Sequence, residues 1–181
     1  MRQWIRLYSL FSFLLLVCLG SAFAFSTDSK ATAPWHLTIT VAESDKEQSL
    51  NLCSANHFHV VLTNHSGTSQ RFWKQSNSWG YSILSFVVTD GNGKTYIIKR
   101  KPRSWRKNYP GFITIKASES YVFNVSFSNE SWDVPQTVCE LNRFKIQAII
   151  NITNDQQTNE YNVWAGRIKS AIYEFKDPKS E

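Results

Sequence analysis

The strongest chemical signal in the chain is a basic segment, residues 99–109, with the sequence KRKPRSWRKNY. Arginine presents a planar fork that matches a carboxylate, sulfate or phosphate, and an indole can stack on a sugar ring or a base. Two prolines, Pro102 and Pro110, disfavour a helix here. The basic segment therefore predicts a loop that binds an anionic partner. Its predicted binding residues are Arg100, Lys101, Arg103, Trp105, Arg106, Lys107 and Tyr109.

A second aromatic and basic group, residues 71–74 (RFWK), lies in the preceding connection, with Trp79 and Tyr81 close by in the sequence. We add Trp73 from this group to the predicted binding residues. Whether the two groups meet depends on the fold. The competing interpretation is a solvated basic loop whose Trp105 packs back on the rim of the domain.

His57 and His59 are candidate metal ligands, because two residues that are two apart on a strand leave it on the same face. His36, His65 and an unbridged Cys53 could add ligands if folding brings them near. The more ordinary interpretation is a pair of exposed strand histidines, and we predict no metal site and no cofactor.

The sequence lacks the common catalytic patterns: a G-x-S-x-G, an H-E-x-x-H, a C-x-x-C or a glycine-rich phosphate loop. A catalytic site can be assembled from scattered residues, so this absence lowers the expectation of an enzyme without excluding one. We predict a protein that is not an enzyme.

The N-terminus has the pattern of a signal peptide. Arg2 and Arg6 precede an apolar run from Leu7 to Leu19, and residues 22–24 (AFA) fit a cleavage site. Cleavage after Ala24 predicts a secreted or periplasmic protein with no stable membrane insertion. A lipoprotein anchored through Cys18 is the alternative.

Two cysteines, Cys53 and Cys139, remain after that cleavage. An exported chain with two cysteines favours one disulfide. If the strands that follow them run in the same direction, their equal offsets of four residues bring both cysteines to one end of the domain. A full reversing strand at 112–115 would break that parity. A metal site or two buried thiols are the alternatives.

Alternating apolar and polar residues predict a chain made of β-strands. The predicted strands are 36–42, 57–64, 81–89, 95–101, 112–115, 121–127, 143–152 and 163–175. In the predicted strand 163–175, the side chains of Trp164, Ile168 and Ile172 share one face. Residues 90–93 (DGNG) are predicted to form a hairpin turn between the strands 81–89 and 95–101. No segment after residue 24 has a convincing helical period.

Seven to eight half-buried strands need a facing sheet, so we predict an all-β antiparallel sandwich over residues 36–176. Residues 25–35 are predicted to be a flexible lead-in and residues 177–181 a C-terminal tail. A small β-barrel is the alternative, since it buries the same alternation.

The strand order resembles an immunoglobulin-like sandwich of secreted bacterial proteins and is distantly similar to the BsuPI-type proteinase inhibitor domain. The resemblance rests on VVLTNHSG (60–67), FVVTDGNGKTYII (86–98), ITIKASESYVFNVSF (113–127) and VWAGRIKS (163–170). Where such domains usually carry Pro-Gly, this chain has Ala117-Ser118. The resemblance implies a sandwich fold, with protease inhibition through loop 102–111 or 71–80 as one activity.

The whole chain has a formal net charge of +6, and residues 99–107 carry six basic side chains with no acidic one. A positive charge this local indicates a partner surface rather than a general property of the protein. The predicted function is a non-catalytic binding module for an acidic polysaccharide, an envelope component or an acidic protein face. Export makes nucleic acid an improbable physiological partner, and the sequence does not determine the oligomeric state. The alternatives are a proteinase inhibitor and a metal carrier or enzyme that uses His57 and His59.

Overall fold

The computed structural model of the chain describes residues 34–41, 53, 58–127 and 131–176. The predicted signal peptide, most of the lead-in, His57 and the C-terminal tail lie outside the described residues. Within the described residues, no helix has the length and the hydrophobicity needed to cross a membrane.

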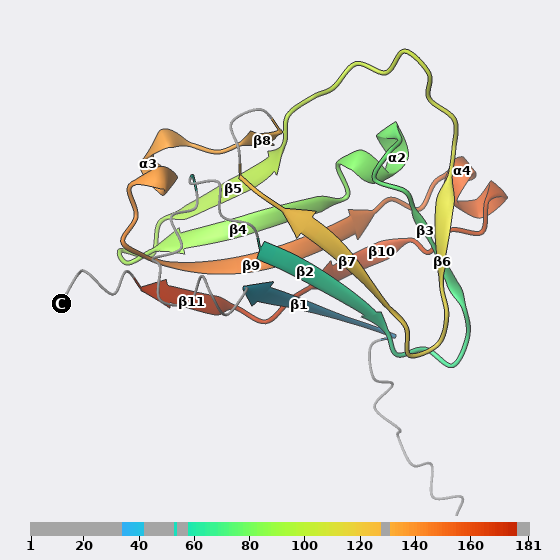
Figure 1. Cartoon of the computed structure of the whole chain (residues 1–181), viewed down its shortest axis with the longest axis horizontal. Helices are drawn as coiled ribbons and strands as arrows, with labels where there is room; N and C mark the ends of the chain where they lie inside the picture. The colour runs from blue at the N-terminus through green and yellow to red at the C-terminus, as the bar shows by residue number, and fades with distance from the viewer. Residues whose placement is uncertain (1–33, 42–52, 54–57, 128–130, 177–181) are drawn as a thin grey trace, which may run out of the picture. The chain divides into compact units, whose positions relative to one another are not determined.

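The described residues form an all-β sandwich, as predicted (Figure 1). One sheet has the order β1-β2-β7, and the other has the order β10-β9-β4-β5-β8 with β11 also paired to β9. Neither sheet closes into a barrel in the part of the chain that the structure describes. The pairs within both sheets are antiparallel.

The strands of the first sheet are β1 (Trp35–Val41), β2 (Phe58–Asn64) and β7 (Ser120–Val125). The second sheet contains β4 (Leu84–Asp90), β5 (Thr95–Arg100), β8 (Trp132–Asp133), β9 (Arg143–Ile152), β10 (Gly166–Lys169) and β11 (Tyr173–Lys176). A separate ribbon pairs β3 (Gln70–Trp73) with β6 (Phe112–Ile115). The short helices are α2 (Ser78–Tyr81), α3 (Gln136–Cys139) and α4 (Gln156–Glu160).

The core lies between the two sheets and is built from alternate residues of their strands. In β2 the buried residues are Phe58, Val60 and Leu62, and in β4 they are Leu84, Phe86 and Val88. The rings of Phe58 and Phe86 meet across the interface with centroids 5.5 Å apart. The period-two pattern of the sequence is therefore the pattern of burial.

The predicted last strand, residues 163–175, is two strands separated by a bulge. β10 pairs Lys169 with Ile149, whereas β11 pairs Tyr173 with Ile146, so three residues face two residues of β9. The extra residue reverses the faces beyond it, and Ile172, predicted to be buried, is 63% exposed.

Ser170 fills the break between β10 and β11. Its backbone N–H donates to the carbonyl of Ala148, and the N–H of Ala148 donates to the Ser170 hydroxyl. The hydroxyl thus takes the place of a ladder carbonyl, which keeps both halves attached to β9.

The ribbon formed by β2 with β7 turns a corner and continues as β3 with β6. Six residues, 64–69, face four residues, 116–119, at this corner, so the regular ladder is interrupted there. Beyond it, β3 leaves the first sheet and contacts the chain next to β10 through the N–H of Trp164, which donates to the carbonyl of Arg71. Strands that pass from one sheet to the other through a bend are typical of β-sandwich corners.

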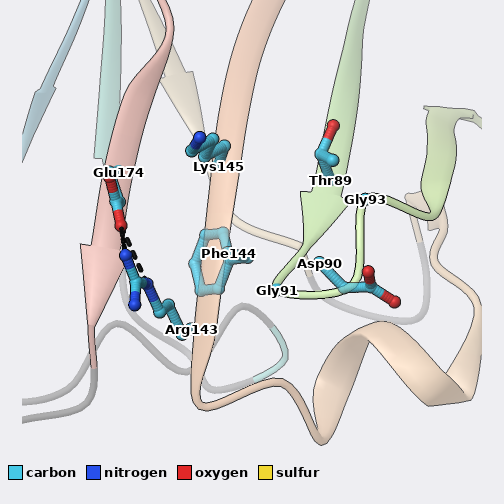
Figure 2. A pocket seen from close by; sticks show the side chains of 8 residues that line it. All are labelled: Thr89, Asp90, Gly91, Gly93, Arg143, Phe144, Lys145 and Glu174. Atoms are coloured by element: carbon cyan, nitrogen blue, oxygen red, sulfur yellow. Dashed lines mark hydrogen bonds and ion pairs between the residues drawn. The ribbon is translucent and has the colours of Figure 1, made fainter.

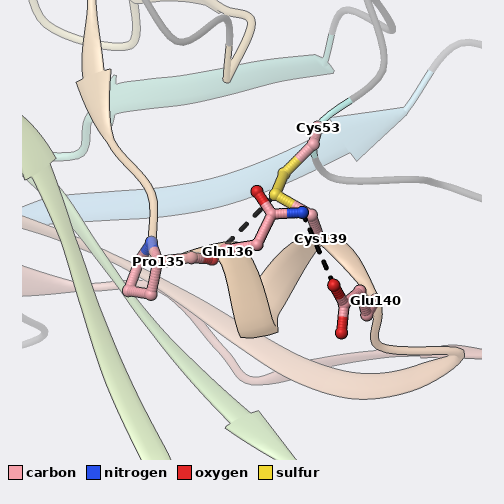
Figure 3. The surroundings of a disulfide bond; sticks show 5 residues. All are labelled: Cys53, Pro135, Gln136, Cys139 and Glu140. Atoms are coloured by element: carbon pink, nitrogen blue, oxygen red, sulfur yellow. Dashed lines mark hydrogen bonds between the residues drawn. A yellow bond between two sulfur atoms is a disulfide. The ribbon is translucent and has the colours of Figure 1, made fainter.

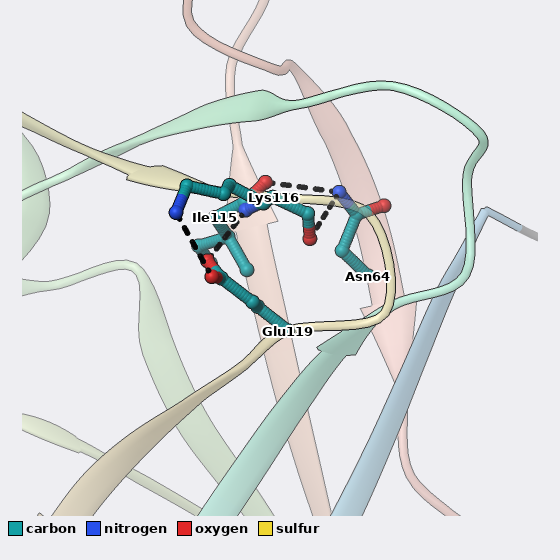
Figure 4. A network of polar contacts seen from close by, with 4 residues as sticks. All are labelled: Asn64, Ile115, Lys116 and Glu119. Atoms are coloured by element: carbon teal, nitrogen blue, oxygen red, sulfur yellow. Dashed lines mark hydrogen bonds and ion pairs between the residues drawn. The ribbon is translucent and has the colours of Figure 1, made fainter.

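Asn64 holds this corner with its whole side chain, which is fully buried (Figure 4). Its Nδ2 donates to the carbonyls of Thr68, Ile115 and Lys116 at 2.9–3.1 Å. Its Oδ1 accepts from the N–H and the hydroxyl of Ser66. The amide thereby satisfies backbone groups that the interrupted ladder leaves without a strand partner.

The turn opposite Asn64 contains a serine in the left-handed region. Ser118 has φ of 64°, and its N–H donates to the carbonyl of Asn64. This is the position at which Ala117-Ser118 departs from the Pro-Gly of the resembling domains. The strain at a non-glycine residue, on the order of 1 kcal/mol, is offset by the hydrogen bonds of the corner.

The predicted disulfide is confirmed: Cys53 and Cys139 are bonded, with their Cα atoms 5.2 Å apart (Figure 3). Residues 112–115 do form a strand, β6, but this strand continues around the corner into β7 and adds no reversal of the chain direction. The two strands that follow the cysteines, β2 and β9, therefore keep the same direction, as the disulfide requires (Figure 1). Cys139 ends α3, and its disulfide sulfur Sγ lies 3.9 Å from the carbonyl oxygen of Pro135.

Reduction of the disulfide should destabilise the fold. The bond closes a span of 86 positions, and the chain-entropy estimate for such a loop is on the order of 4 kcal/mol as an upper value. Thermal unfolding with and without a reductant should show a lower Tm in the reduced protein. The matched control is Cys53→Ser/Cys139→Ser, whose Tm should not respond to the reductant; an equal response would refute the assignment.

Replacement of Asn64 should also destabilise the fold. We expect Asn64→Ala to lower the free energy of unfolding by about 3 kcal/mol, because the buried carbonyl of Ile115 and the part-buried carbonyls of Thr68 and Lys116 lose their donor. Asn64→Asp, which keeps the volume but cannot donate, should be at least as damaging. Denaturant titration measures both, with Asn124→Ala, an exposed position of β7, as the control expected within about 0.5 kcal/mol of wild type. A stable Asn64→Asp variant would show that packing, not hydrogen bonding, is what matters at this site.

Candidate functional site

The basic segment begins in β5 and leads to β6. The corner at Asn64, where the β2–β7 pair continues as the β3–β6 pair, determines which residues lie beside it. β3 leads into α2, while the far end of the connection enters β6, the partner of β3 (Figure 1). Residues 71–74 therefore lie beside residues 111–114, which come shortly after the basic segment, and α2 contacts the segment itself.

Polar contacts fasten the connection to α2. Asn108 accepts a hydrogen bond from the N–H of Ser78 at 3.0 Å, and its Nδ2 donates to the Ser78 hydroxyl. The carbonyl of Gly111 accepts from Nδ2 of Asn77 and from the N–H of Lys74. A loop without regular secondary structure is thus held in place near its C-terminal end.

The helix α2 itself was missed by the sequence analysis, which predicted a strand from residue 81. Asn77 caps the helix by accepting from the N–H of Gly80 at 3.0 Å. Glycine is required at that position, because a Cβ there would collide with the backbone carbonyl of Lys74. A capping asparagine followed by a glycine was the available signal, and a single helical turn is too short to show a period.

Stacked planar groups join the basic segment to the domain. The guanidinium of Arg100 lies over the ring of Trp132, 4.1 Å from its centroid, and 5.4 Å from that of Tyr81. Trp105 meets Tyr81 edge to face with centroids 5.6 Å apart, and the guanidinium of Arg103 lies 5.1 Å from the Trp105 centroid. Trp105 is half-buried, so it packs back on the domain, as the competing interpretation proposed, and also presents part of its ring.

A cleft of about 470 Å³ opens beside these groups. Its lining residues are Gln75, Tyr81, Arg100, Pro102, Arg103 and Ser131. Burial lowers the pKa of Arg100, and the neighbouring Tyr81 partly offsets that shift. An arginine remains charged in any case, so a half-desolvated cation faces this cleft.

The outer part of the basic segment is exposed. Arg103, Arg106 and Lys107 are exposed, and Tyr109 is 77% exposed. The ion pairs among the described residues join Lys116 to Glu119 and Arg143 to Glu174. Neither pair involves the three exposed cations, so their charge faces solvent.

Trp73 does not belong to this surface, contrary to the prediction. It is 3% exposed and packs against Trp79 and Tyr161, with ring centroids 6.0 and 5.7 Å away. Its neighbour Phe72 is buried too, stacked on Trp164. Both faces of β3 are covered, which the sequence of a four-residue strand does not reveal.

Arg71 also has a structural role. Its guanidinium donates to the carbonyl of Tyr161 at 3.0 Å and lies over the ring of Phe112. Trp132 was not predicted as a partner of the basic segment, and Tyr81 was named only as a neighbour of residues 71–74, because only the fold brings both rings to the segment.

A second cleft, of about 240 Å³, lies at the β4–β5 turn (Figure 2). Its charges are largely engaged: Arg143 pairs with Glu174, and Asp90 accepts from the backbone N–H groups of Asn92 and Lys94. These bonds confirm the predicted hairpin turn at residues 90–93, with Gly93 at φ of 85°. Because Arg143, Glu174 and Asp90 already bond to neighbouring groups of the turn and strands, we assign no binding role to this cleft.

The predicted histidine pair is only partly described. His59 lies on β2 with its Nδ1 buried, and Cys53 is engaged in the disulfide, so it cannot serve as a ligand. Within the described residues, no group of three or more His, Cys, Asp or Glu side chains is placed to hold a metal ion. His36 and His65, by contrast, do come together, with ring centroids 5.9 Å apart.

No family model and no curated protein matches the chain. Among solved structures, the protein assigned as ApaA from Bordetella pertussis is similar over 81% of this chain and 94% of that chain, with a TM-score of 0.40 and 11% sequence identity.

Proposed function

We propose that this protein is a non-catalytic binding module that recognises an anionic partner through its basic segment. The observation that carries the proposal is the arrangement of Arg103, Arg106 and Lys107. These cations are exposed, lack acidic partners among the described residues, and stand on a loop that is fastened to the domain. An acidic polysaccharide or an anionic polymer of the cell envelope fits this chemistry.

The aromatic groups support a saccharide as the partner. A cleft of about 470 Å³ is in the size range of small-molecule sites, and it combines two guanidinium groups with the ring of Tyr81. Guanidinium groups bind carboxylates or sulfates in a bidentate manner, while aromatic faces contact sugar rings. Because the loop is held at α2, little conformational entropy is lost when a ligand binds.

Binding should depend on salt in a way that the basic segment controls. We expect titration of the purified protein with heparin and with polygalacturonate to give affinities that fall steeply as salt rises. Arg103→Ala/Arg106→Ala should reduce the slope of log K against log salt by about two, because two counterion-releasing contacts are lost. Neutral dextran should not bind.

The matched control removes the same charge elsewhere. Arg167→Ala/Lys169→Ala deletes two exposed cations of β10 and should leave the slope unchanged. If both double variants reduce the slope equally, the attraction is a property of net charge and the basic segment is not the recognition surface. If Trp105→Ala lowers Tm and leaves polyanion affinity unchanged, Trp105 acts only in holding the loop.

We also propose that the protein works outside the cytoplasm. The support is the disulfide, which persists in oxidising compartments, together with the signal-like N-terminal sequence. Mass spectrometry of the protein recovered from the extracytoplasmic fraction should find Phe25 as the first residue. An intact Met1, or a lipid on Cys18, would contradict this processing.

A further inference from the structure

Two exposed histidines, His36 and His65, lie together on the outer face of the first sheet. Neither belongs to the basic segment. His36 belongs to β1 and is paired with Thr63, so His65, two residues further along, is its diagonal neighbour on the same face. The imidazole rings are 5.9 Å apart at an interplanar angle of 70°. Side chains in this diagonal relation are within reach of each other when they are long or aromatic.

The backbone under both rings is held in place. The N–H of His65 donates to the carbonyl of Pro34 at 2.8 Å, which extends the β1–β2 pairing past the end of β2. The residue before it, Asn64, is fixed by its five side-chain hydrogen bonds. Figure 4 shows those to the carbonyls of Ile115 and Lys116. With the backbone held in this way, the relative position of the two imidazole rings depends on the side-chain torsions of His36 and His65.

We propose that His36 and His65 form a binding site for a divalent transition metal of the Zn²⁺, Cu²⁺ or Ni²⁺ type. Imidazole nitrogens bind these ions at about 2.0–2.1 Å, which places the centroids of two rings on one ion about 5 Å apart. The observed separation of 5.9 Å exceeds that value by about 1 Å, and both side chains are exposed and so free of core packing that would hold their rotamers. Water fills the remaining coordination positions, so the ion stays exchangeable.

This pair differs from the candidate ligands named from the sequence. His57 and His59 were candidates because they are two residues apart on one predicted strand, although no metal site was predicted. His36 and His65 are 29 positions apart, and only the register of β1 with β2 joins them. The ion would connect β1 to the chain just beyond β2, and a ligand of the folded state alone raises the stability of that state.

The test is a metal titration of the protein, purified without an affinity tag and treated with a chelator beforehand. Calorimetry with ZnCl₂ and with CuCl₂ should show saturable binding, and thermal unfolding should show a higher Tm in the presence of the ion. His36→Ala and His65→Ala should each weaken binding by at least about tenfold, since loss of a supporting group alone typically costs that much. Each should also abolish the rise in Tm.

Two further variants make the outcome decisive. His59→Gln and His57→Gln leave the proposed pair intact, and both should retain the affinity and the metal-induced rise in Tm. Since His36 and His65 are exposed, their alanine variants should keep the metal-free Tm of the parent, which separates loss of a ligand from loss of folding. Binding that survives in both alanine variants, or that is lost in His57→Gln or His59→Gln, would overturn the proposal.

Discussion

The arrangement of this domain depends on one buried amide at the corner where a β-ribbon bends. Asn64 is fully buried, and its side chain makes five hydrogen bonds to groups on both sides of the bend. A backbone carbonyl that is buried without a donor costs about 1–3 kcal/mol, so the buried carbonyl of Ile115 and the part-buried carbonyls of Thr68 and Lys116 would destabilise the corner without this amide. Because an asparagine supplies both donors and an acceptor, one residue can satisfy the chain entering the bend and the chain leaving it.

The corner has a consequence for the surface on which a partner would bind. It directs β3 and β6 out of the first sheet together, so that α2, which follows β3, lies next to the end of the connection that precedes β6. The contacts of Asn108 with Ser78 and of Gly111 with Asn77 are possible only because of that arrangement. A structural residue that contacts none of the cations of the basic segment thus helps to determine where those cations stand.

The sequence predicted the fold class and most strands because each half-buried strand carries its own period-two pattern. Residues 143–152 match the predicted strand at both ends. The failure at Ile172 has a physical cause: a bulge inserts one residue, and every side chain beyond it changes face. A bulge is stabilised by contacts from another strand, here Ala148 with Ser170, so the pattern of a single strand cannot reveal it.

The candidate site was predictable to the extent that its residues are adjacent in the sequence. The cations and Trp105 were found because charge and aromatic character are properties of a segment, whereas burial is a property of the fold. Trp73 and Trp105 are the same type of residue beside similar basic neighbours, yet one is in the core and the other is half-buried at the surface. The difference arises because β3 is covered on both faces.

The charges of Arg106 and Lys107 have no structural partner among the described residues. A cation that stabilises a fold usually has a defined partner, as Arg143 has in Glu174 and Arg71 has in the carbonyl of Tyr161. Arg100 follows that rule through its stacking on Trp132, but Arg106 and Lys107 have no such partner among the described residues. Like charges held close together on a fastened loop repel one another, which disfavours the free state slightly. An anion that lies along the loop removes that repulsion and also gains from the half-desolvated Arg100 at the cleft. On the proposed function, it is therefore the exposed cations without a structural partner that would favour an anionic ligand over a neutral one.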